Sequence, residues 1–483
     1  MIRTPQPGIL RPARDILEIA DFIGDPVTGA EFPEAKVRFR NDRWAQTVGL
    51  SNLDDAQWAA HFGRFAPLPG SLETPLAMRY HGHQFRVYNP EIGDGRGFLF
   101  AQLRDGDGRL LDLGTKGSGQ TPWSRFGDGR LTLKGAVREI LATEMLEALG
   151  VNTSKTFSVI ETGEALHRGD EPSPTRSAVL FRLSHGHIRI GSFQRLATLG
   201  DDANLARLTD YALAHYYDAP GGDDAPVRLL SHVTERTADL AASYMVAGFV
   251  HGVLNSDNIN ISGESFDYGP WRFAQVFDPG FTAAYFDEAG LYAFGRQAEA
   301  IHWDVVQLAV ALSRIADQEA LVEALNRFAD LYRAALVRRM LWRLGVAPEG
   351  AENDSALVQS IEAALIASRV GIDRFFFDWQ GGSRRAASRA DPVYAEECFA
   401  DVRQRLAGYQ SARPLDHPYW AGVAPVSMSI ETVENLWAHI AERDDWGPLY
   451  AHIEAVRTMG RAMVEPDDIS FDHLRHSRAG GNP

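Results

Sequence analysis

A long apolar segment near the middle of the chain, residues 233–250, runs directly into a polar loop, residues 251–269. Apolar side chains recur in this segment at the spacing of an α-helix, as at Leu240, Tyr244 and Ala247. The sequence therefore predicts a buried helix that breaks at Gly252 and delivers the polar loop into a cleft. Residues 276–280 are expected to lead away from the loop as a strand and a turn.

The polar loop contains residues that could bind a divalent cation. Asp257 and Asn258 are adjacent, and Asp267 opens an Asp-Tyr-Gly sequence ten residues after Asp257. Carboxylate and amide oxygens are hard ligands that suit Mg²⁺ or Mn²⁺. Asp and Asn are also common in turns, because their side chains hydrogen-bond to nearby backbone groups. On this stretch alone a turn without a metal is the more frequent outcome, so the metal hypothesis depends on residues upstream.

Length, charge and cysteine content limit the classes of protein to consider. A chain of 483 residues is long enough for two or three packed units, and its formal charge of −16 argues against a nucleic-acid partner. Cys398 is the only cysteine, which excludes an internal disulfide and a cysteine-based metal site. The first residues lack the apolar core of a signal peptide, and the longest apolar run, residues 241–250, is too short to span a bilayer. We therefore expect a cytoplasmic protein with no membrane partner.

Four regions differ in pattern along the chain. Residues 1–75 are rich in proline and are expected to form an extension packed on the main body. Residues 76–195 predict a small β-rich lobe with one helix, and residues 196–420 a larger helical lobe. Residues 421–483 predict a helical segment that ends in a disordered tail from Pro466. This order favours an α+β fold with the two-lobed plan of a protein kinase, which binds nucleotide between its lobes.

Periodicity places the individual elements of the two lobes. Strands are predicted at residues 98–103, 110–116, 156–162 and 177–183, with a helix at residues 133–149. Helices of the second lobe are predicted at residues 205–217, 233–250, 298–316, 319–344 and 355–367. Residues 381–392 read as a solvated surface loop that carries Arg384, Arg385 and Arg389.

A kinase-like cleft needs a turn without bulky side chains over the phosphates of the nucleotide. Gly93, Gly95 and Gly97 could provide it, and Arg96 would add positive charge. GDGRG is an ordinary hairpin turn in most proteins, so this signal is weak by itself.

Three further basic residues could hold phosphates. Alternation along residues 110–116 puts Lys116 on the cleft face, where Glu139 of the following helix could pair with it, as in kinases. Arg182 lies between apolar neighbours in its strand, and Arg189 follows seven residues later. A buried arginine needs a partner, because an unpaired buried charge costs several kcal/mol. A structural carboxylate would serve each arginine, and a polyphosphate chain would suit both of them together with Lys116.

Two departures disfavour a standard protein kinase. The sequence His251-Gly252-Val253 stands where the His-Arg-Asp catalytic loop of kinases would begin. Asp267-Tyr268-Gly269 resembles the Asp-Phe-Gly motif, but it follows Asn258 by only nine positions.

Five motifs, in this order, resemble those of the selenoprotein O family of kinase-like proteins. The motifs are YHGHQFRVYNPEIGDGR (80–96), GTKGSGQTPWSRFGDGR (114–130), AVREIL (136–141), FRLSHGHIRIGSF (181–193) and HGVLNSDNINISGESFDYGPW (251–271). Arg86 and Tyr88 replace the Gly and Trp that are usual in the first motif. The resemblance covers roughly residues 75–315 and is poor in the C-terminal third.

The resemblance implies protein adenylylation, in which ATP binds in an orientation flipped relative to kinases and AMP passes to a protein Ser, Thr or Tyr hydroxyl. It assigns nucleotide contacts to one set of residues: Gly93, Gly95, Arg96, Asp128, Gly129, Lys116, Arg182, Arg189 and Asp267. Lys116, Arg182 and Arg189 would hold the terminal phosphates, with Glu139 orienting the lysine. Asn258 and Asp267 would bind Mg²⁺ or Mn²⁺, and Asp257 would act as the general base.

Two alternatives share these ligands. A pseudokinase scaffold would bind ATP without catalysis, which the missing His-Arg-Asp motif favours and the joint presence of Asp257, Asn258 and Asp267 opposes. An atypical kinase would transfer the γ-phosphate instead. Family members often carry a redox-active Cys or selenocysteine near the C-terminus, and the final residues here contain none, so we expect activity that is indifferent to reductant.

Overall fold

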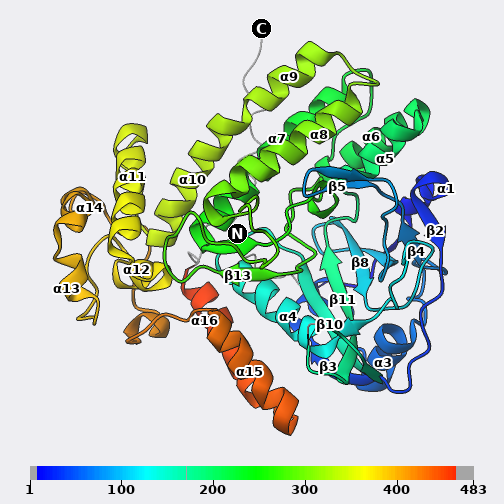
Figure 1. Ribbon diagram of the computed structural model, residues 1–483, viewed down its shortest axis with the longest axis horizontal. Coiled ribbons are helices and arrows are strands. Elements are labelled where there is room, and N and C mark those ends of the chain that lie inside the picture. The colour runs from blue at the N-terminus through cyan, green and yellow to red at the C-terminus, as the bar shows by residue number, and fades with distance from the viewer. Residues whose placement is uncertain (1–7, 170, 464–483) are drawn as a thin grey trace.

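The computed structural model describes residues 8–169 and 171–463, which form two lobes (Figure 1). An antiparallel β-sheet dominates the first lobe, and helices make up most of the second. The α+β fold expected from the sequence is confirmed, with a β-rich first lobe and a larger helical second lobe. The predicted disordered tail from Pro466 lies outside the described residues.

The sheet of the first lobe joins segments from residue 12 to residue 184. Among the described residues its nine strands follow the order β2-β4-β7-β8-β11-β10-β3, with β1 paired to β7 and β9 paired to β11. All of the pairs are antiparallel. The strands are β1 (Pro12–Ala13), β2 (Gly24–Pro26), β3 (Lys36–Arg40), β4 (Leu76–Met78), β7 (Leu99–Arg104), β8 (Leu110–Lys116), β9 (Leu131–Thr132), β10 (Lys155–Leu166) and β11 (Thr175–Ser184).

The four strands predicted from periodicity are present in this sheet. Residues 98–103 and 110–116 correspond to β7 and β8, and the other two predicted strands lie within the longer β10 and β11. The region before residue 76 contributes β1, β2 and β3. The segment expected to pack on the main body is therefore held there by backbone pairing.

Helices cover both faces of the sheet. One face packs against α2 (Asp42–Thr47) and α3 (Asp55–Arg64), where the rings of Phe62 and Phe181 lie 5.0 Å apart. The opposite face packs against α4 (Leu133–Ala148), the helix predicted at residues 133–149. The Thr132 side chain caps α4 by accepting a hydrogen bond from the backbone N–H of Gly135. Alternation along β8 thus sends apolar side chains toward α3 and leaves Lys116 on the side of α4.

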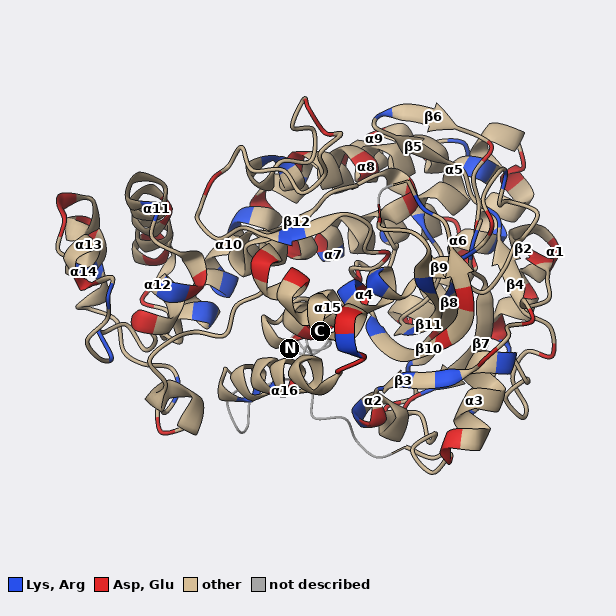
Figure 2. Cartoon of the chain, turned by 60° about the horizontal axis from the view of Figure 1, so that its bottom comes forward, with Lys and Arg blue, Asp and Glu red and all other residues tan. Residues whose placement is uncertain are grey.

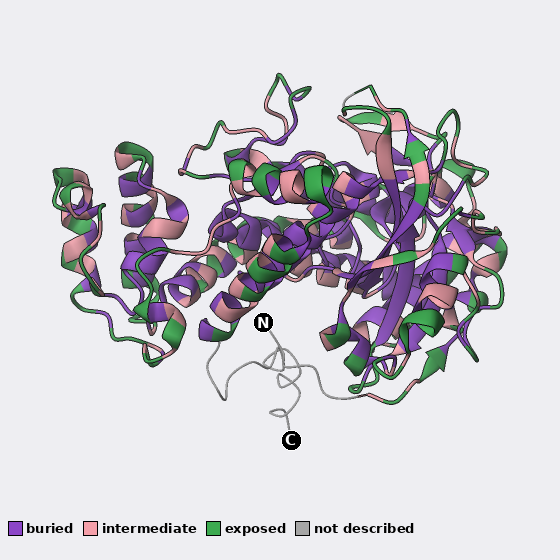
Figure 3. Ribbon diagram, turned by 90° about the horizontal axis from the view of Figure 1, so that it is seen from below, coloured by how far each residue is buried: buried purple, intermediate pink, exposed green. Residues whose placement is uncertain are grey.

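The second lobe is built around α7, which packs against α6, α8, α9 and α10. Its helices are α5 (Ile190–Leu199), α6 (Asp202–Tyr217), α7 (Ala225–Ala247), α8 (Gln297–Leu312), α9 (Gln318–Asn326), α10 (Phe328–Leu344), α11 (Ala351–Ser368), α12 (Ile372–Asp378), α13 (Asp391–Tyr394) and α14 (Ala400–Leu406). Figure 3 shows buried segments running through the sheet and the central helices, with exposed residues on outer loops and outward helix faces.

Two small antiparallel pairs flank the polar loop that follows α7. The first is the hairpin of β5 (Gly82–Gln84) and β6 (Val87–Asn89), and the second pairs β12 (Phe249–His251) with β13 (Trp271–Phe273). The loop between β12 and β13 contains a single 3₁₀ turn, η2 (Ser256–Asn258). Both ends of the polar loop are therefore fixed by backbone pairing at the edge of the cleft.

Three boundary predictions around the polar loop were wrong. The helix predicted at residues 233–250 begins earlier, at Ala225, and ends at Ala247 rather than at Gly252. Gly248 stops it, because its φ of 71° is in the left-handed region that glycine adopts without strain. The strand that leaves the loop is β13 and not residues 276–280, where Val276 forms one isolated bridge with Gly371.

Two further predictions in the helical lobe were wrong. The helix predicted at residues 319–344 is divided at Arg327 into α9 and α10, and Arg327 keeps nearly helical angles, so the apolar pattern continues through the break. The loop at residues 381–392 is not simply solvated. Arg384 pairs with Asp391 and lies 4.9 Å from the ring centroid of Tyr394, and Arg385 lies 4.1 Å from that of Phe377. Both arginines therefore hold the loop on the helical lobe.

The C-terminal helices α15 (Ile430–Arg443) and α16 (Gly447–Ala462) return to the first lobe (Figure 1). Helix α16 packs along α4, and Arg457 forms an ion pair of 2.6 Å with the buried Glu144 of α4. Asp444, between the two helices, pairs with Arg38 at 2.9 Å and with Arg176 at 2.7 Å. The C-terminal segment thus supports the helix that carries Glu139.

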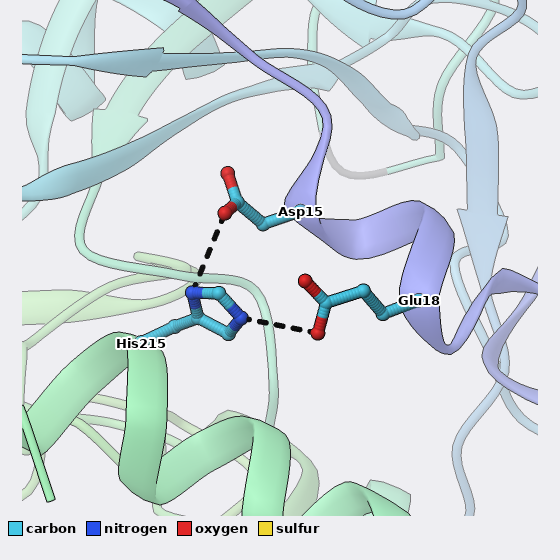
Figure 4. A group of neighbouring side chains, drawn as sticks. All are labelled: Asp15, Glu18 and His215. Carbon is cyan, nitrogen blue, oxygen red and sulfur yellow. Dashed lines mark hydrogen bonds and ion pairs between the residues drawn. The ribbon is translucent and has the colours of Figure 1, made fainter.

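A histidine connects the N-terminal segment to α6 (Figure 4). His215 Nδ1 lies 3.6 Å from Asp15, and its Nε2 lies 3.3 Å from Glu18 of the 3₁₀ turn η1 (Asp15–Glu18). The two carboxylates contact opposite nitrogens of one ring, and Asp15 also binds Arg104 at 2.7 Å. This arrangement suits a polar link between the two segments better than convergence of three ligands on one metal ion.

Charged residues of both signs are interspersed over the elements of both lobes (Figure 2). In the described part of the chain, none of the helices combines the length and the apolar character that crossing a membrane requires.

Candidate active site

A cavity of about 690 Å³ opens between the lobes. The first lobe supplies the glycine-rich turn and the end of β8, and the second lobe supplies the polar loop after α7. Residues expected at the site line the cavity, namely Gly93, Gly95, Arg96, Lys116, Asp128, Gly129, Arg182, Arg189, Asp257 and Asp267. Glu139 and Asn258 are not among the lining residues, although Glu139 contacts one of them.

The end of β8 places Lys116 against α4. Its ammonium forms an ion pair with Glu139, and it also lies 3.2 Å from Asp267 Oδ1 and 3.3 Å from the Tyr268 carbonyl oxygen. Both side chains of the Lys116–Glu139 pair are buried, with exposed fractions of 6% and 4%. The strand-to-helix pair expected from the sequence is therefore present in this structure, and it holds the lysine at the floor of the cavity.

Two buried arginines converge on the same carboxylate as Lys116. Arg189 lies 3.3 Å from Asp267 Oδ2, and Arg182 lies 3.7 Å from Asp267 Oδ1. Both guanidinium groups also stack on the ring of Phe266, at 4.9 Å for Arg182 and 4.7 Å for Arg189. Burial acts to raise the pKa of Asp267, but the surrounding cations outweigh it and hold that pKa well below its usual value. Asp267 is therefore an ionised carboxylate in a strongly positive pocket.

The pKa of Asp257 is shifted in the opposite direction to that of Asp267. Burial raises its pKa to about 6, and the nearby Arg189 opposes this shift only in part. The residue is 7% exposed, and its Oδ1 has no hydrogen-bond partner in the structure. Leaving a buried carboxylate oxygen without a hydrogen-bond partner costs folding free energy, and such groups are often found at functional sites. Asp257 is therefore available to accept a proton or to bind a cation.

Asn258 follows Asp257 in η2 but turns away from the cavity lining. Its side-chain amide donates a hydrogen bond of 3.0 Å to the carbonyl oxygen of Val253 within the same loop. The two adjacent residues thus have different settings, with Asp257 at the cavity wall and the Asn258 amide bracing the loop.

The glycine-rich turn is packed against a second loop. A Cβ atom on Gly93 would lie 2.5 Å from the Trp123 ring, and one on Gly97 would lie 2.1 Å from the Thr115 carbonyl oxygen. Close packing within the protein thus requires glycine at these two positions even when no nucleotide is bound. The second loop, residues 117–130, contributes Asp128 and Gly129 to the cavity.

Sequence reasoning missed two residues of this site. Asp94 is buried and pairs with Arg189 at 3.2 Å, and Trp123 lies against the glycine-rich turn while its indole N–H donates to Asp25. The only sequence signal for Asp94 was its position between two glycines. Trp123 lies within the family motif at residues 114–130, but neither its residue type nor its spacing indicated a contact with the glycine-rich turn.

The donor set fits a polyphosphate with a divalent cation. Lys116, Arg182 and Arg189 supply the positive charge that phosphate oxygens need. The carboxylates of Asp257 and Asp267 line the same cavity, and oxygen ligands of this kind suit Mg²⁺ or Mn²⁺.

The family model and the similar proteins indicate the same family for this chain. Residues 15–414 match the family described as protein adenylyltransferase SelO. A protein nucleotidyltransferase YdiU from Synechocystis sp. is 48% identical over 447 residues, which cover 88% of this chain and 93% of the relative. A protein of the same name from Synechococcus elongatus is 42% identical over 470 residues, which cover 91% of this chain and 94% of the relative.

Among solved structures, a Toxoplasma gondii rhoptry antigen kinase domain is similar over 61% of this chain and 85% of its own chain, at 11% identity. Its TM-score of 0.26 is too low to support any argument. The match over residues 15–414 and the relatives that align along nearly their whole length decide the assignment. The chain belongs to the SelO family of protein adenylyltransferases.

Proposed function

We propose that this cleft transfers AMP from ATP to a Ser, Thr or Tyr hydroxyl of an acceptor protein and releases pyrophosphate. The observation that carries the proposal is the convergence of Lys116, Arg182 and Arg189 on Asp267, beside an Asp257 oxygen without a partner. The relatives named protein nucleotidyltransferase support the same class of reaction.

In the proposed reaction a bond forms between the acceptor oxygen and the α-phosphorus. The bond from that phosphorus to the bridging oxygen of the β-phosphate breaks, and its electrons leave with pyrophosphate. Negative charge therefore develops on the β- and γ-phosphates, where Lys116, Arg182 and Arg189 stabilise it. Because these side chains are buried, their charges act with little screening by water.

Asp257 is the proposed general base. It accepts the proton of the attacking hydroxyl through its unpaired Oδ1, and such proton transfer contributes about 10²–10⁴-fold to a rate. A pKa of about 6 leaves the carboxylate ionised at neutral pH while keeping it basic enough to accept a proton.

Asp267 and Asn258 are the proposed ligands of Mg²⁺ or Mn²⁺, which when bound neutralises phosphate charge and orients the polyphosphate. The ionised state of Asp267 supports its part in this proposal. For Asn258 the side-chain oxygen would have to face the cavity while the amide nitrogen keeps its hydrogen bond to Val253.

The experiment that tests the function compares two labels. Purified protein is incubated with Mg²⁺ or Mn²⁺ and with ATP labelled at the α- or the γ-phosphorus, and protein-bound label is counted. Transfer of α-label, with an added AMP mass on Ser, Thr or Tyr, is the expected result. Transfer of γ-label alone would replace the proposal by a kinase, and ATP binding without any transfer would replace it by a scaffold.

A further inference from the structure

The β5–β6 hairpin packs against the 3₁₀ turn that contains Asp257, and its Gln84 lines the same cavity as Asp257. The hairpin is fixed to three successive residues of the polar loop. The backbone N–H of Phe85 donates to Asn255 Oδ1 at 3.0 Å, and that of His83 donates to Ser256 Oγ at 2.8 Å. Gly82 lies against Asp257 so closely that a Cβ atom there would be 2.8 Å from the Asp257 side chain.

The tip of this hairpin has an unusual backbone. Phe85 and Arg86 both have positive φ angles, 51° and 62°, although neither is glycine. Arg86, which stands where the family pattern has Gly, compensates through side-chain contacts. It pairs with Glu299 at 3.0 Å and lies 5.4 Å from the ring centroid of Trp303 on α8. The tip is therefore held in a fixed position at the cavity rim, where Gln84 is a lining residue.

A row of four aromatic side chains leads outward from Asn255 to the protein surface. The Tyr292 hydroxyl donates to Asn255 Oδ1 at 2.7 Å, and the ring of Phe85 lies 5.0 Å from that of Tyr292. The ring of Phe286 lies 5.8 Å from that of Phe85, and the ring of Tyr285 lies 5.2 Å from that of Phe286. We call Tyr292, Phe85, Phe286 and Tyr285 the aromatic row.

The outer end of the aromatic row is exposed to solvent. Tyr285 is 91% exposed and Phe286 is 47% exposed, while Val87 of the hairpin is 70% exposed. Exposed aromatic side chains that adjoin a catalytic loop are unfavourable in water and are enriched at binding surfaces. The same loop also carries the exposed Glu288, in a chain of net charge −16.

We propose that the outer end of the aromatic row is the docking surface for the acceptor protein, and that it selects an acceptor segment with an apolar side chain close to the modified hydroxyl. The inference rests on the proposed function. Continuity with the loop that carries Asp257 places such a side chain within a few residues of the reacting oxygen. Glu288 disfavours acidic residues at the same point of the acceptor segment.

The test uses the full chain with Mg-ATP labelled at the α-phosphorus and two synthetic peptides of equal length. Both carry one Ser, flanked by Leu in the first peptide and by Asp in the second. The wild type is expected to modify the Leu peptide with a kcat/KM at least tenfold above that for the Asp peptide. Tyr285→Ser/Phe286→Ser should lose at least tenfold on the Leu peptide and keep only the part of the discrimination that Glu288 provides, with the Kd for Mg-ATP unchanged. Tyr285→Ser alone, which alters only the outermost ring, should show a smaller loss of the same kind.

Val423→Ser is the matched control, because Val423 is 90% exposed and does not line the cavity. It should leave both peptide rates and the Kd for Mg-ATP at wild-type values. Equal rates of the wild type on the two peptides, or a double variant as fast as the wild type, would overturn the inference. So would conversion of a wild-type dimer to a monomer by the double variant at unchanged peptide rates, since a second copy would then be the occupant. Absence of α-label from every acceptor with the wild type would instead overturn the proposed function, and the inference with it.

Discussion

Replacing Lys116 by methionine should destabilise the protein more than replacing its partner Glu139 by glutamine. Lys116 is the cation that the structure pairs with Glu139, whose side chain is 4% exposed. Without Lys116 the glutamate is a buried charge that has lost its partner. Asp267 would still have cationic partners, because Arg182 and Arg189 remain 3.7 Å and 3.3 Å from its carboxylate.

The expected magnitudes follow from this asymmetry. Removing one partner of a buried ion pair costs about 3–5 kcal/mol, which is our expectation for Lys116→Met. Glu139→Gln should cost about 1–3 kcal/mol, because Lys116 keeps Asp267 and the Tyr268 carbonyl oxygen as partners. In the double variant the buried position is neutral, so it should recover about 2 kcal/mol relative to Lys116→Met.

Urea titration of the four proteins measures the free energies of unfolding, and α-label transfer measures their activity. Stability and activity should separate, because the double variant regains stability but still lacks the lysine that holds phosphate. Both variants without Lys116 should transfer AMP at least about 10²-fold more slowly than the wild type. The reasoning is refuted if Lys116→Met is as stable as Glu139→Gln, or if the double variant is no more stable than Lys116→Met.

Three other predictions concern the metal, the cysteine and acid stability. Asp267→Asn should weaken metal-dependent ATP binding in calorimetry and abolish transfer, whereas Asp257→Asn should keep ATP binding and slow transfer about 10²–10⁴-fold; equal metal-dependent binding by Asp267→Asn and the wild type would contradict the metal assignment. Cys398→Ser should transfer AMP at the wild-type rate with or without reductant, and activation of the wild type by reductant that the variant lacks would show redox control through this partly buried thiol. Burial acts to raise the pKa of Asp239, but Arg339 and Arg338 outweigh it and lower this pKa to about 2 from an ordinary 3.8. Ionised Asp239 should therefore stabilise the folded protein by about 2 kcal/mol above pH 4, and this contribution should be lost as the pH falls through 2. Acid unfolding of Asp239→Asn should lack this component, and acid titration curves of the same shape for both proteins would refute it.

Periodicity predicted the sheet and most helices because their burial is one-sided or complete, as in β8 and α4. It failed where the pattern does not change at a boundary. Arg327 separates two helices while keeping nearly helical angles, so no residue type marks the break. Strand β13 has only three residues, and each of them pairs with a residue of β12 that lies twenty or more positions earlier in the chain. Helix α5 begins immediately after Arg189, in a segment for which periodicity predicted no helix.

The residues of the candidate site could be predicted where a family motif assigns a role to a particular position. Lys116 and Glu139 were paired correctly because strand alternation and helix order fix their relative position. The environment of Asn258 was not predictable, because its hydrogen bond to Val253 depends on the conformation of η2. The aromatic row could not be predicted from the sequence either, because Phe85 and Tyr292 come into contact only when the hairpin has folded onto the polar loop.

The separation of α4 and α16 along the chain has a consequence for how this protein is made. Arg457 and Glu144, which pair across these helices, are 313 positions apart. A ribosome that has completed α4 must therefore add more than three hundred residues before the helix that covers it exists. Until then Glu144 lacks Arg457, and the apolar residues of α4 that share a buried cluster with Leu449 and Ile453 lack the cover that α16 provides. The packing around the helix that positions Lys116 is thus completed only after α16 has been synthesised.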